Sequence, residues 1–366
     1  MPPKTTLSAS RIKTALNCSW KYVQSYVNKI PEPKNRGASI GSAVHVVLEC
    51  LAHPRREKLA RQIIKSGKLF SGKNRQGIKK LVYKLAHQYD VADEESIDKI
   101  EQFILNGLQH DFFGEKRGKP VLALTEKDFD FAAEEYKIRG FIDRLFIYKD
   151  GHALIRDYKS SKETYKGEEA SKSNLQAQSY VLAVKKLSDE KKLPPVKSIS
   201  VEFLFLKYDC TEESEWATGI YQGKVTKKQY HNGGGCITLD YDLDDPELFE
   251  FELAEYQRYV DSLDEKTACS NFAAEQGEPE DGSFGGRLSC GYSKYEGQLK
   301  KDGTIMFACA LKYPLDYYYI TDAENNFAAS CFLHEREKLE NKYPPSKFHW
   351  EERHYEGCKF WREKSY

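Results

Sequence analysis

Apolar residues recur at helical spacing through the N-terminal part of the chain. Such spacing, with Ser8 or Ser10 available as an N-cap, predicts a helix over residues 8–27 and a second helix over residues 37–53. The stripe that the first helix would bury is Ile12, Leu16, Trp20 and Val23, and that of the second is Val44, Leu48 and Leu51. Two short amphipathic helices within residues 55–84 and one further helix over residues 94–109 complete the helical region.

Alternating apolar residues then predict paired strands in the middle of the chain. A strand beginning at about Val121 pairs with one through Leu145 and Ile147, and the turn Asp150-Gly151 leads into a strand that ends on residues 157–159. A helix starting near residue 175 follows, and then a strand over residues 196–208, for which we expect residues 215–227 to be the partner. The fold expected is α/β, with a mixed central sheet from about Val121 to Lys207 flanked by helices.

The remainder of the chain is less regular. A short strand is expected within residues 231–242 and an acidic helix over residues 246–263. Residues 265–330, rich in Gly and acids before an aromatic run, have the composition of an insertion, and a helix from about Ala328 to Asn341 precedes the tail. We therefore expect a core over residues 1–264 that includes the helical basic segment 55–110, an insertion over 265–330, and a C-terminal helix and tail over 331–366 that packs on the core.

Charged residues interrupt the predicted strands at two places. Asp143 stands between Ile142 and Arg144, and the next strand ends on Asp157-Tyr158-Lys159. Residues two apart in a strand project to the same face, so Asp157 and Lys159 point together while Tyr158 points away. Two carboxylates and an ammonium near the ends of paired strands are costly to desolvate unless they bind something. We expect that ligand to be a divalent metal ion.

Four motifs occur in order: G-x-x-x-H ending at His45, G-F-I-D-R around Asp143, D-Y-K at 157–159, and Gln176-x-x-x-Tyr180. In this order and spacing they resemble the PD-(D/E)XK nuclease superfamily, specifically its RecB-like exonuclease branch. The resemblance runs from about Leu7 to Tyr180. It implies a restriction-endonuclease-like fold and hydrolysis of phosphodiester bonds. Two departures are that Ile142 stands where the family name has proline, and that Asp157 replaces the commoner glutamate.

The resemblance also implies roles for individual residues. Mg²⁺ or Mn²⁺ would be held by His45, Asp143, Asp157 and the backbone carbonyl of Tyr158. Lys159 would stand beside the attacking water, and Gln176 and Tyr180, stacked four residues apart on one helix, would border the site. For His45 a buried core histidine is the alternative interpretation.

Positive charge is local in this chain. The totals are equal, with 56 Lys and Arg and 56 Asp and Glu, but residues 55–84 hold Glu57 as their only acid. This imbalance predicts a surface for DNA phosphates, the alternative being a solvated helix face. The contacts predicted are Arg55, Arg56, Arg61, Lys65, Lys79 and Lys80.

The nine cysteines are irregularly spaced, which favours a reducing compartment over a disulfide scaffold. Some RecB-like nucleases carry an iron–sulfur cluster, for which the residues here would be Cys18, Cys309, Cys331 and Cys358. We do not expect it, because the closely spaced C-terminal cysteines of that pattern are missing. A second possibility is a zinc site joining Cys331-x-x-His334 and His354-x-x-x-Cys358. We favour the simpler interpretation that the cysteines are buried and bind no metal.

The function predicted is a metal-dependent DNA exonuclease, acting on single strands or DNA ends in recombination, replication or repair. The alternatives are a structure-specific or non-specific endonuclease and a catalytically inactive module that binds DNA ends. The sequence contains no phosphate-binding G-x-x-x-x-G-K-[ST] motor motif, so a separate helicase, single-strand-binding protein or annealing protein is the expected partner. Without an apolar signal core or a long apolar run, we expect a cytoplasmic protein, in the host cytoplasm if phage-encoded, with no membrane contact.

Overall fold

The computed structural model describes residues 4–33, 36–72, 75–161, 165, 167–207, 216–221, 224–229, 235–243, 245–269 and 309–362. The chain divides into two compact units, residues 34–254 and residues 1–33 with 255–366, and the boundary falls within helix α8 (Asp245–Asp261). Most of the predicted insertion lies outside the described residues. The three-part division at residues 264 and 330 stays a prediction. No described helix is both long and apolar enough to cross a membrane.

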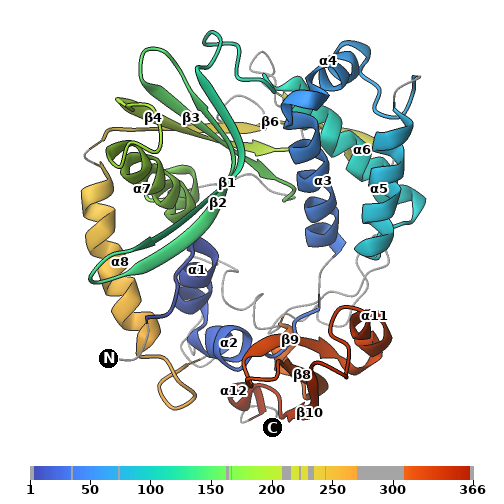
Figure 1. Ribbon diagram of the computed structural model, residues 1–366, viewed down its shortest axis with the longest axis vertical. Helices are drawn as coiled ribbons and strands as arrows, with labels where there is room; N and C mark the ends of the chain where they lie inside the picture. The colour runs from blue at the N-terminus through green and yellow to red at the C-terminus, as the bar shows by residue number, and fades with distance from the viewer. Residues whose placement is uncertain are drawn as a thin grey trace. The chain divides into compact units, whose positions relative to one another are not determined.

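The unit of residues 34–254 is built on a five-stranded mixed sheet, as predicted, in the order β1-β2-β3-β4-β7 (Figure 1). Only β3 and β4 are parallel, and helix α7 connects them, as a parallel crossover requires. The strands are β1 (Leu122–Ala132), β2 (Lys137–Ile147), β3 (His152–Lys159), β4 (Ser198–Phe205) and β7 (Cys236–Tyr241).

Helices cover both faces of this sheet. On one face the apolar sides of α3 to α6 form a core with Tyr158, Leu204 and Leu206 of the sheet, whereas α7 (Leu175–Asp189) contacts β2 and β4. In α3 the residues Val44, Leu48 and Leu51 are buried, as their spacing predicted. The four helices are α3 (Arg36–Ala52), α4 (Glu57–Ser66), α5 (Gln76–Gln88) and α6 (Glu94–Gln109).

The predicted pairing of residues 215–227 with the strand over 196–208 is wrong. Strand β5 (Trp216–Tyr221) pairs with β6 (Lys224–Gln229) in a separate hairpin, and β7 takes the edge of β4 instead. The physical reason is the alternation in β7, which buries Ile237, Leu239 and Tyr241 on one face of the sheet.

The second unit begins with a helix that is not continuous, contrary to the prediction over residues 8–27. Cys18 has an extended backbone and its thiol accepts a hydrogen bond from Lys21 N, so it ends α1 (Ala9–Asn17) and caps α2 (Ser19–Tyr22). A π-helical turn (Val23–Val27) follows. The break also changes the buried face, and Leu16, predicted to be buried, is 49% exposed.

The helix predicted from Ala328 to Asn341 is also wrong in its first half. Residues Phe327–Phe332 form strand β9, which pairs with β8 (Leu315–Thr321), and the helix is only α11 (Arg336–Glu340). A partner strand thus satisfies the backbone of residues that were expected to be helical. β10 (His349–Tyr355) completes a three-stranded sheet in the order β10-β8-β9, and α12 (Lys359–Arg362) ends the described chain. Short 3-10 turns lie at Pro54–Arg56, Gly167–Ala170, Ala310–Lys312 and Leu333–Glu335.

Candidate active site

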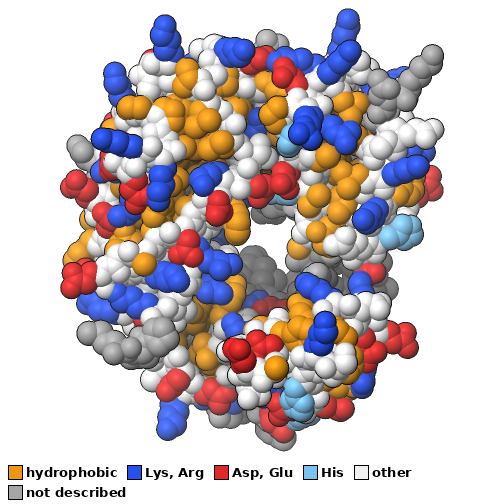
Figure 2. Space-filling view, in the orientation of Figure 1, with side chains coloured by type: hydrophobic (Ala, Val, Ile, Leu, Met, Phe, Trp, Pro, Cys, Tyr) orange, Lys and Arg blue, Asp and Glu red, His pale blue; other side chains and the backbone are white. Residues whose placement is uncertain are grey.

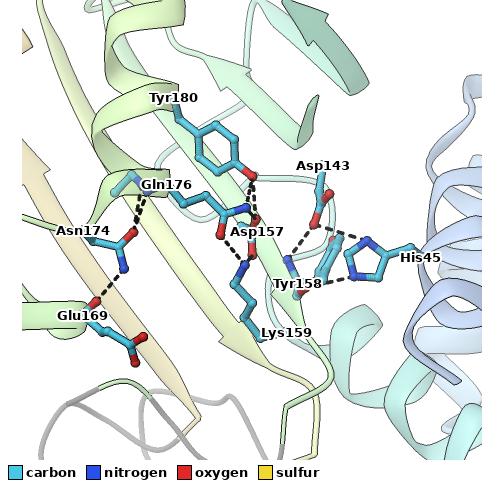
Figure 3. A network of polar contacts seen from close by, with 10 residues as sticks. His45, Asp143, Asp157, Tyr158, Lys159, Glu169, Asn174, Gln176 and Tyr180 are labelled. Atoms are coloured by element: carbon cyan, nitrogen blue, oxygen red, sulfur yellow. Dashed lines mark hydrogen bonds and ion pairs between the residues drawn. The ribbon is translucent and has the colours of Figure 1, made fainter. Parts of the chain in front are cut away.

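The sheet opens between β2 and β3, and the candidate site lies at this opening. The two strands pair from Ile147↔Ala153 to Arg144↔Arg156 and then separate. Beyond the last pair, the Asp143 carboxylate takes the place of a ladder acceptor, since its Oδ2 accepts a hydrogen bond of 2.8 Å from Tyr158 N (Figure 3). The separation leaves the side chains of Asp143 and Asp157 in one polar region, just beyond the last β2–β3 pair.

His45 reaches this region from helix α3. Its Nε2 donates a hydrogen bond of 2.9 Å to the carbonyl oxygen of Tyr158, and its Nδ1 lies 3.5 Å from Asp143 Oδ2 (Figure 3). Burial opposes the charged imidazolium, but the carboxylate of Asp143, with Asp157 and Glu126 farther off, outweighs burial and raises the pKa of His45 to about 9. At neutral pH this histidine is therefore a cation between two of the groups predicted to hold a metal.

Gly41 explains the first residue of the G-x-x-x-H motif. A Cβ at this position would lie 2.4 Å from Oγ of Ser160, the residue that follows β3. Glycine therefore lets α3 approach the strand end without displacing Ser160, and His45, one turn later, lies on the same face of the helix.

Asp157 and Lys159 form the second half of the site together with two residues of α7. Lys159 Nζ lies 2.7 Å from Asp157 Oδ2 and donates to Gln176 Oε1 at 2.5 Å. The other oxygen, Asp157 Oδ1, accepts from Gln176 Nε2 at 3.0 Å and from the Tyr180 hydroxyl at 2.7 Å (Figure 3). These four polar side chains, all predicted as site residues, make one connected network.

Burial sets the charge states in this network. Asp157 is 3% exposed, and burial together with nearby Asp143 raises its pKa against the opposing effect of Lys159. For Lys159 burial disfavours the ammonium, but the attraction and hydrogen bond of the Asp157 carboxylate, together with Tyr165 and Asp143, outweigh burial and raise its pKa. The lysine is therefore charged at neutral pH, and its neighbours restrict it to a position beside Asp157.

Asn174 positions Gln176 and was not anticipated from the sequence as part of the site. It is the N-cap of α7, where its Oδ1 accepts hydrogen bonds of 3.0 Å from the backbone N–H groups of Gln176 and Ala177. Its Nδ2 donates to the Glu169 carbonyl at 2.7 Å (Figure 3). An Asn directly before an apolar helical run is the signal that could have identified it.

Glu126 is a second residue that the sequence analysis missed. It lies in β1 where the register places it opposite Asp143, and one ligand atom each from Glu126, Asp143 and His45 lie within 4.8 Å of one another. Burial and the Asp143 carboxylate raise the pKa of Glu126 to about 7. The sequence carries no signal for this second carboxylate, because its place depends on the register of β1 with β2.

A cavity of about 410 Å³ opens beside these three residues. Figure 2 shows acidic side chains (red) between β1 and α3, where it lies. The residues that line it are Ala38, Gly41, Ser42, His45, Val46, Glu49, Glu126 and Ser160.

The basic segment is less uniform than its sequence indicated. Arg61 lies on α4, where Glu57 binds it at 2.8 Å and Glu115, distant in sequence, at 2.6 Å, so its charge is already compensated. In Figure 2 the Lys and Arg side chains over α4 and α5 are scattered rather than gathered into one patch. The other predicted DNA contacts are exposed: Arg55, Arg56, Lys65, Lys79 and Lys80. Their contact with DNA stays a prediction.

The cysteines named for a cluster occupy different environments within the unit that contains both chain ends. Cys331 is 1% exposed in β9, and burial raises the pKa of its thiol to about 11. Cys18 lies at the helix break, with its thiol 4.0 Å from the Cys269 carbonyl oxygen. His354, part of the alternative zinc pattern, pairs instead with Asp316 at 2.6 Å. That these cysteines bind neither a cluster nor zinc stays a prediction.

A second group of residues with metal-binding side chains consists of His110, Glu202 and Cys236. We interpret this group as part of the packing of the sheet, because its carboxylate is already paired. The Glu202 carboxylate is bound at 2.8 Å by Arg156, which lies directly opposite in the parallel β3–β4 pair and is 1% exposed. Burial by itself would raise the pKa of Glu202, but the Arg156 guanidinium outweighs it and, with His110, lowers this pKa to about 2. The carboxylate is thus already neutralised by a buried cation.

A sequence profile of the PD-(D/E)XK nuclease superfamily matches residues 6–295. The chain belongs to this superfamily. Nucleases of this superfamily generally use divalent metal ions. The donor set of the present site fits such an ion, because one imidazole and two carboxylates, Glu126 and Asp143, offer atoms within 4.8 Å of one another.

Solved structures also resemble this superfamily member. One is a candidate exonuclease from Eubacterium rectale, with 9% identity and a TM-score of 0.36 over 70% of this chain and 81% of that chain. Another is a protein from Vibrio cholerae, with 12% identity and a TM-score of 0.21 over 61% of this chain and 57% of that chain. A comparison with curated proteins finds no match.

Proposed function

We propose that this superfamily nuclease is a metal-dependent DNA exonuclease that hydrolyses phosphodiester bonds in single-stranded DNA or at DNA ends. The observation that supports this most directly is two pairs of contacting charged residues at the strand opening, in each of which a buried aspartate contacts a partly buried cation. One consists of Asp143 and His45, and the other of Asp157 and Lys159. Each functional group that phosphodiester hydrolysis by this superfamily needs is therefore present within one site.

The residues have separate tasks in this proposal. Asp143, Asp157, His45 and the Tyr158 carbonyl would hold Mg²⁺ or Mn²⁺, which when bound supplies an activated water and neutralises charge on the scissile phosphate. Lys159, kept protonated by Asp157, provides a fixed positive charge where negative charge develops in the transition state.

The residues of α7 keep these groups in position. Gln176 contacts Asp157 through its amide nitrogen and Lys159 through its amide oxygen, so one side chain fixes the distance between carboxylate and ammonium. Tyr180 donates to the same Asp157 oxygen. Placing charges in advance in this way avoids reorganisation during the reaction.

The test is a time course on end-labelled linear single- and double-stranded DNA and on a closed circle, with Mn²⁺, with Mg²⁺ or with chelator. We expect metal-dependent loss of the linear DNA while the circle is spared, and the labelled end then gives the polarity. Nicking of the circle would instead indicate an endonuclease. DNA binding without cleavage under any condition would indicate an inactive module that binds DNA ends.

Substitution of Lys159 tests the assignment of the site. Lys159→Ala removes the fixed positive charge and should lower the cleavage rate by about 100-fold or more, with DNA affinity in chelator largely retained. Lys149→Ala, which removes an exposed lysine near the β2–β3 turn, is the matched control and should cleave normally. Undiminished cleavage by Lys159→Ala would contradict the assignment.

A further inference from the structure

Glu126 has a position that the packing of a strand does not explain. The register of β1 and β2 runs through Thr125↔Arg144 and Lys127↔Ile142, which brings Glu126 opposite Asp143. The two residues between these pairs do not themselves pair, and Glu126 has a φ of 47°. A non-glycine residue in the left-handed region is uncommon, and within a β-strand it is unfavourable unless its surroundings hold it there.

The cation that acts on Glu126 is the His45 imidazolium, which favours the charged form of the carboxylate. Among the described residues, its carboxylate makes no hydrogen bond and no ion pair with a Lys or Arg. Its electrostatic neighbours include the carboxylates of Asp143, Glu49 and Asp157. Like charges directly opposite each other on paired strands destabilise the pair. One imidazolium therefore faces several carboxylates, and a bound metal cation in its place would balance more of their charge.

Asp157 is less available to that cation than Glu126 is. Gln176 and Tyr180 donate to one oxygen of Asp157, and Lys159 is bound to the other. Glu126, in contrast, lines the cavity beside His45 and has an atom within 4.8 Å of ligand atoms of His45 and Asp143. Glu126 on β1 is thus a carboxylate of this region that no hydrogen bond from a described residue occupies.

We propose that Glu126 is a metal ligand of the active site, binding with Asp143 and His45, and that it contributes more to metal affinity than Asp157 does. This inference rests on the proposed metal-dependent nuclease. It assigns to β1 a ligand that lies outside the four motifs of the sequence. The strained backbone of Glu126 is then the means by which its carboxylate is directed to the metal.

Isothermal titration of the full-length protein with Mn²⁺ alone, without DNA, tests the proposal. Glu126→Gln keeps the size of the side chain but removes its charge, and it should weaken Mn²⁺ binding at least ten-fold, more than Asp157→Asn does. Asp128→Asn is the matched control, since its carboxylate is exposed on the same strand, and it should bind as the wild type does. A Glu126→Gln affinity within two-fold of the wild type would overturn the inference.

A second variant separates metal binding from folding. Glycine adopts a positive φ without penalty, so Glu126→Gly should raise the melting temperature of the metal-free protein while it weakens Mn²⁺ binding. A purely structural glutamate would not give these opposite changes. A lower melting temperature together with unchanged Mn²⁺ affinity would contradict a ligand role.

The cleavage assay distinguishes failure of the inference from failure of the proposed function. If the wild type cleaves DNA only with metal and Glu126→Gln binds Mn²⁺ normally, the nuclease stands and the inference on Glu126 is wrong. If the wild type neither binds Mn²⁺ nor cleaves DNA, both are wrong.

Discussion

His45 shows how one residue can stabilise the site both without and with a metal. Without metal, the imidazolium lies between the Tyr158 carbonyl and the Asp143 carboxylate, and it offsets the repulsion among the acids. A metal ion requires the neutral imidazole as its ligand. If His45 binds the metal as proposed, proton and metal compete for this residue.

This competition predicts a pH dependence of metal binding. The pKa of His45 is raised from 6.5 to about 9 in the metal-free protein, so most molecules must lose this proton to bind metal below pH 9. We expect apparent Mn²⁺ affinity, measured by titration calorimetry in buffers of different ionisation enthalpy, to rise with pH and level off near pH 9, with about one proton released from His45 per ion. His45→Gln should lose this component of the proton release, and a wild type that releases none would contradict the competition.

The same shift affects stability with a defined sign. Because the folded pKa is raised, the protonated imidazolium stabilises the metal-free fold fully below about pH 6.5, and this contribution is lost as pH rises through 9.

The first turn of α7 both starts the helix and positions a side chain of the candidate site. Asn174 closes the first turn with two hydrogen bonds, and the second residue of that turn is Gln176, which contacts both Asp157 and Lys159. Any loosening of the first turn would therefore move the amide that fixes the distance between carboxylate and ammonium.

Replacing the cap tests this connection. Asn174→Ala should lower the free energy of unfolding by about 1 kcal/mol, measured by urea denaturation, and should also lower kcat, because Gln176 is no longer fixed. Asn174→Ser, which keeps a capping oxygen, should recover most of both effects. Reduced stability in Asn174→Ala with an unchanged kcat would mean that the cap does not position Gln176.

At the scale of the whole molecule the charges balance, since the formal net charge is zero. Long-range attraction to DNA must then come from limited regions, and the folded chain reduces one of them by pairing Arg61 with Glu57 and Glu115. The exposed lysines Lys79 and Lys80 on α5 remain candidates for phosphate contact.

Salt dependence of DNA binding tests that surface. If Lys79 and Lys80 each contact a phosphate, the double variant Lys79→Gln/Lys80→Gln should bind single-stranded DNA more weakly in chelator, and the slope of log K against log salt should fall by about 1.4. The control Lys149→Gln/Lys192→Gln removes the same charge from two other exposed positions and should leave the slope unchanged. Equal slopes for both double variants would exclude this face of α5 from the interface.

The sequence by itself determined the elements and chemistry that depend on short-range order. Helical spacing defined α3 and α6, and the Asp150-Gly151 turn set the β2–β3 hairpin, because these patterns depend on neighbours within a few residues. The four motifs indicated the superfamily, which the profile match confirms. The roles that they assign to Asp143, Asp157 and Lys159 stay a prediction.

The tertiary structure decided what depends on contacts between distant residues. The partner of β4, the strand in place of a C-terminal helix, and the pairing of Arg61 with Glu115 each required knowledge of which surfaces meet. Glu126 is the clearest case. Its sequence neighbours resemble those of any polar strand residue, and only the register with β2 and a backbone held at positive φ bring its carboxylate to Asp143 and His45.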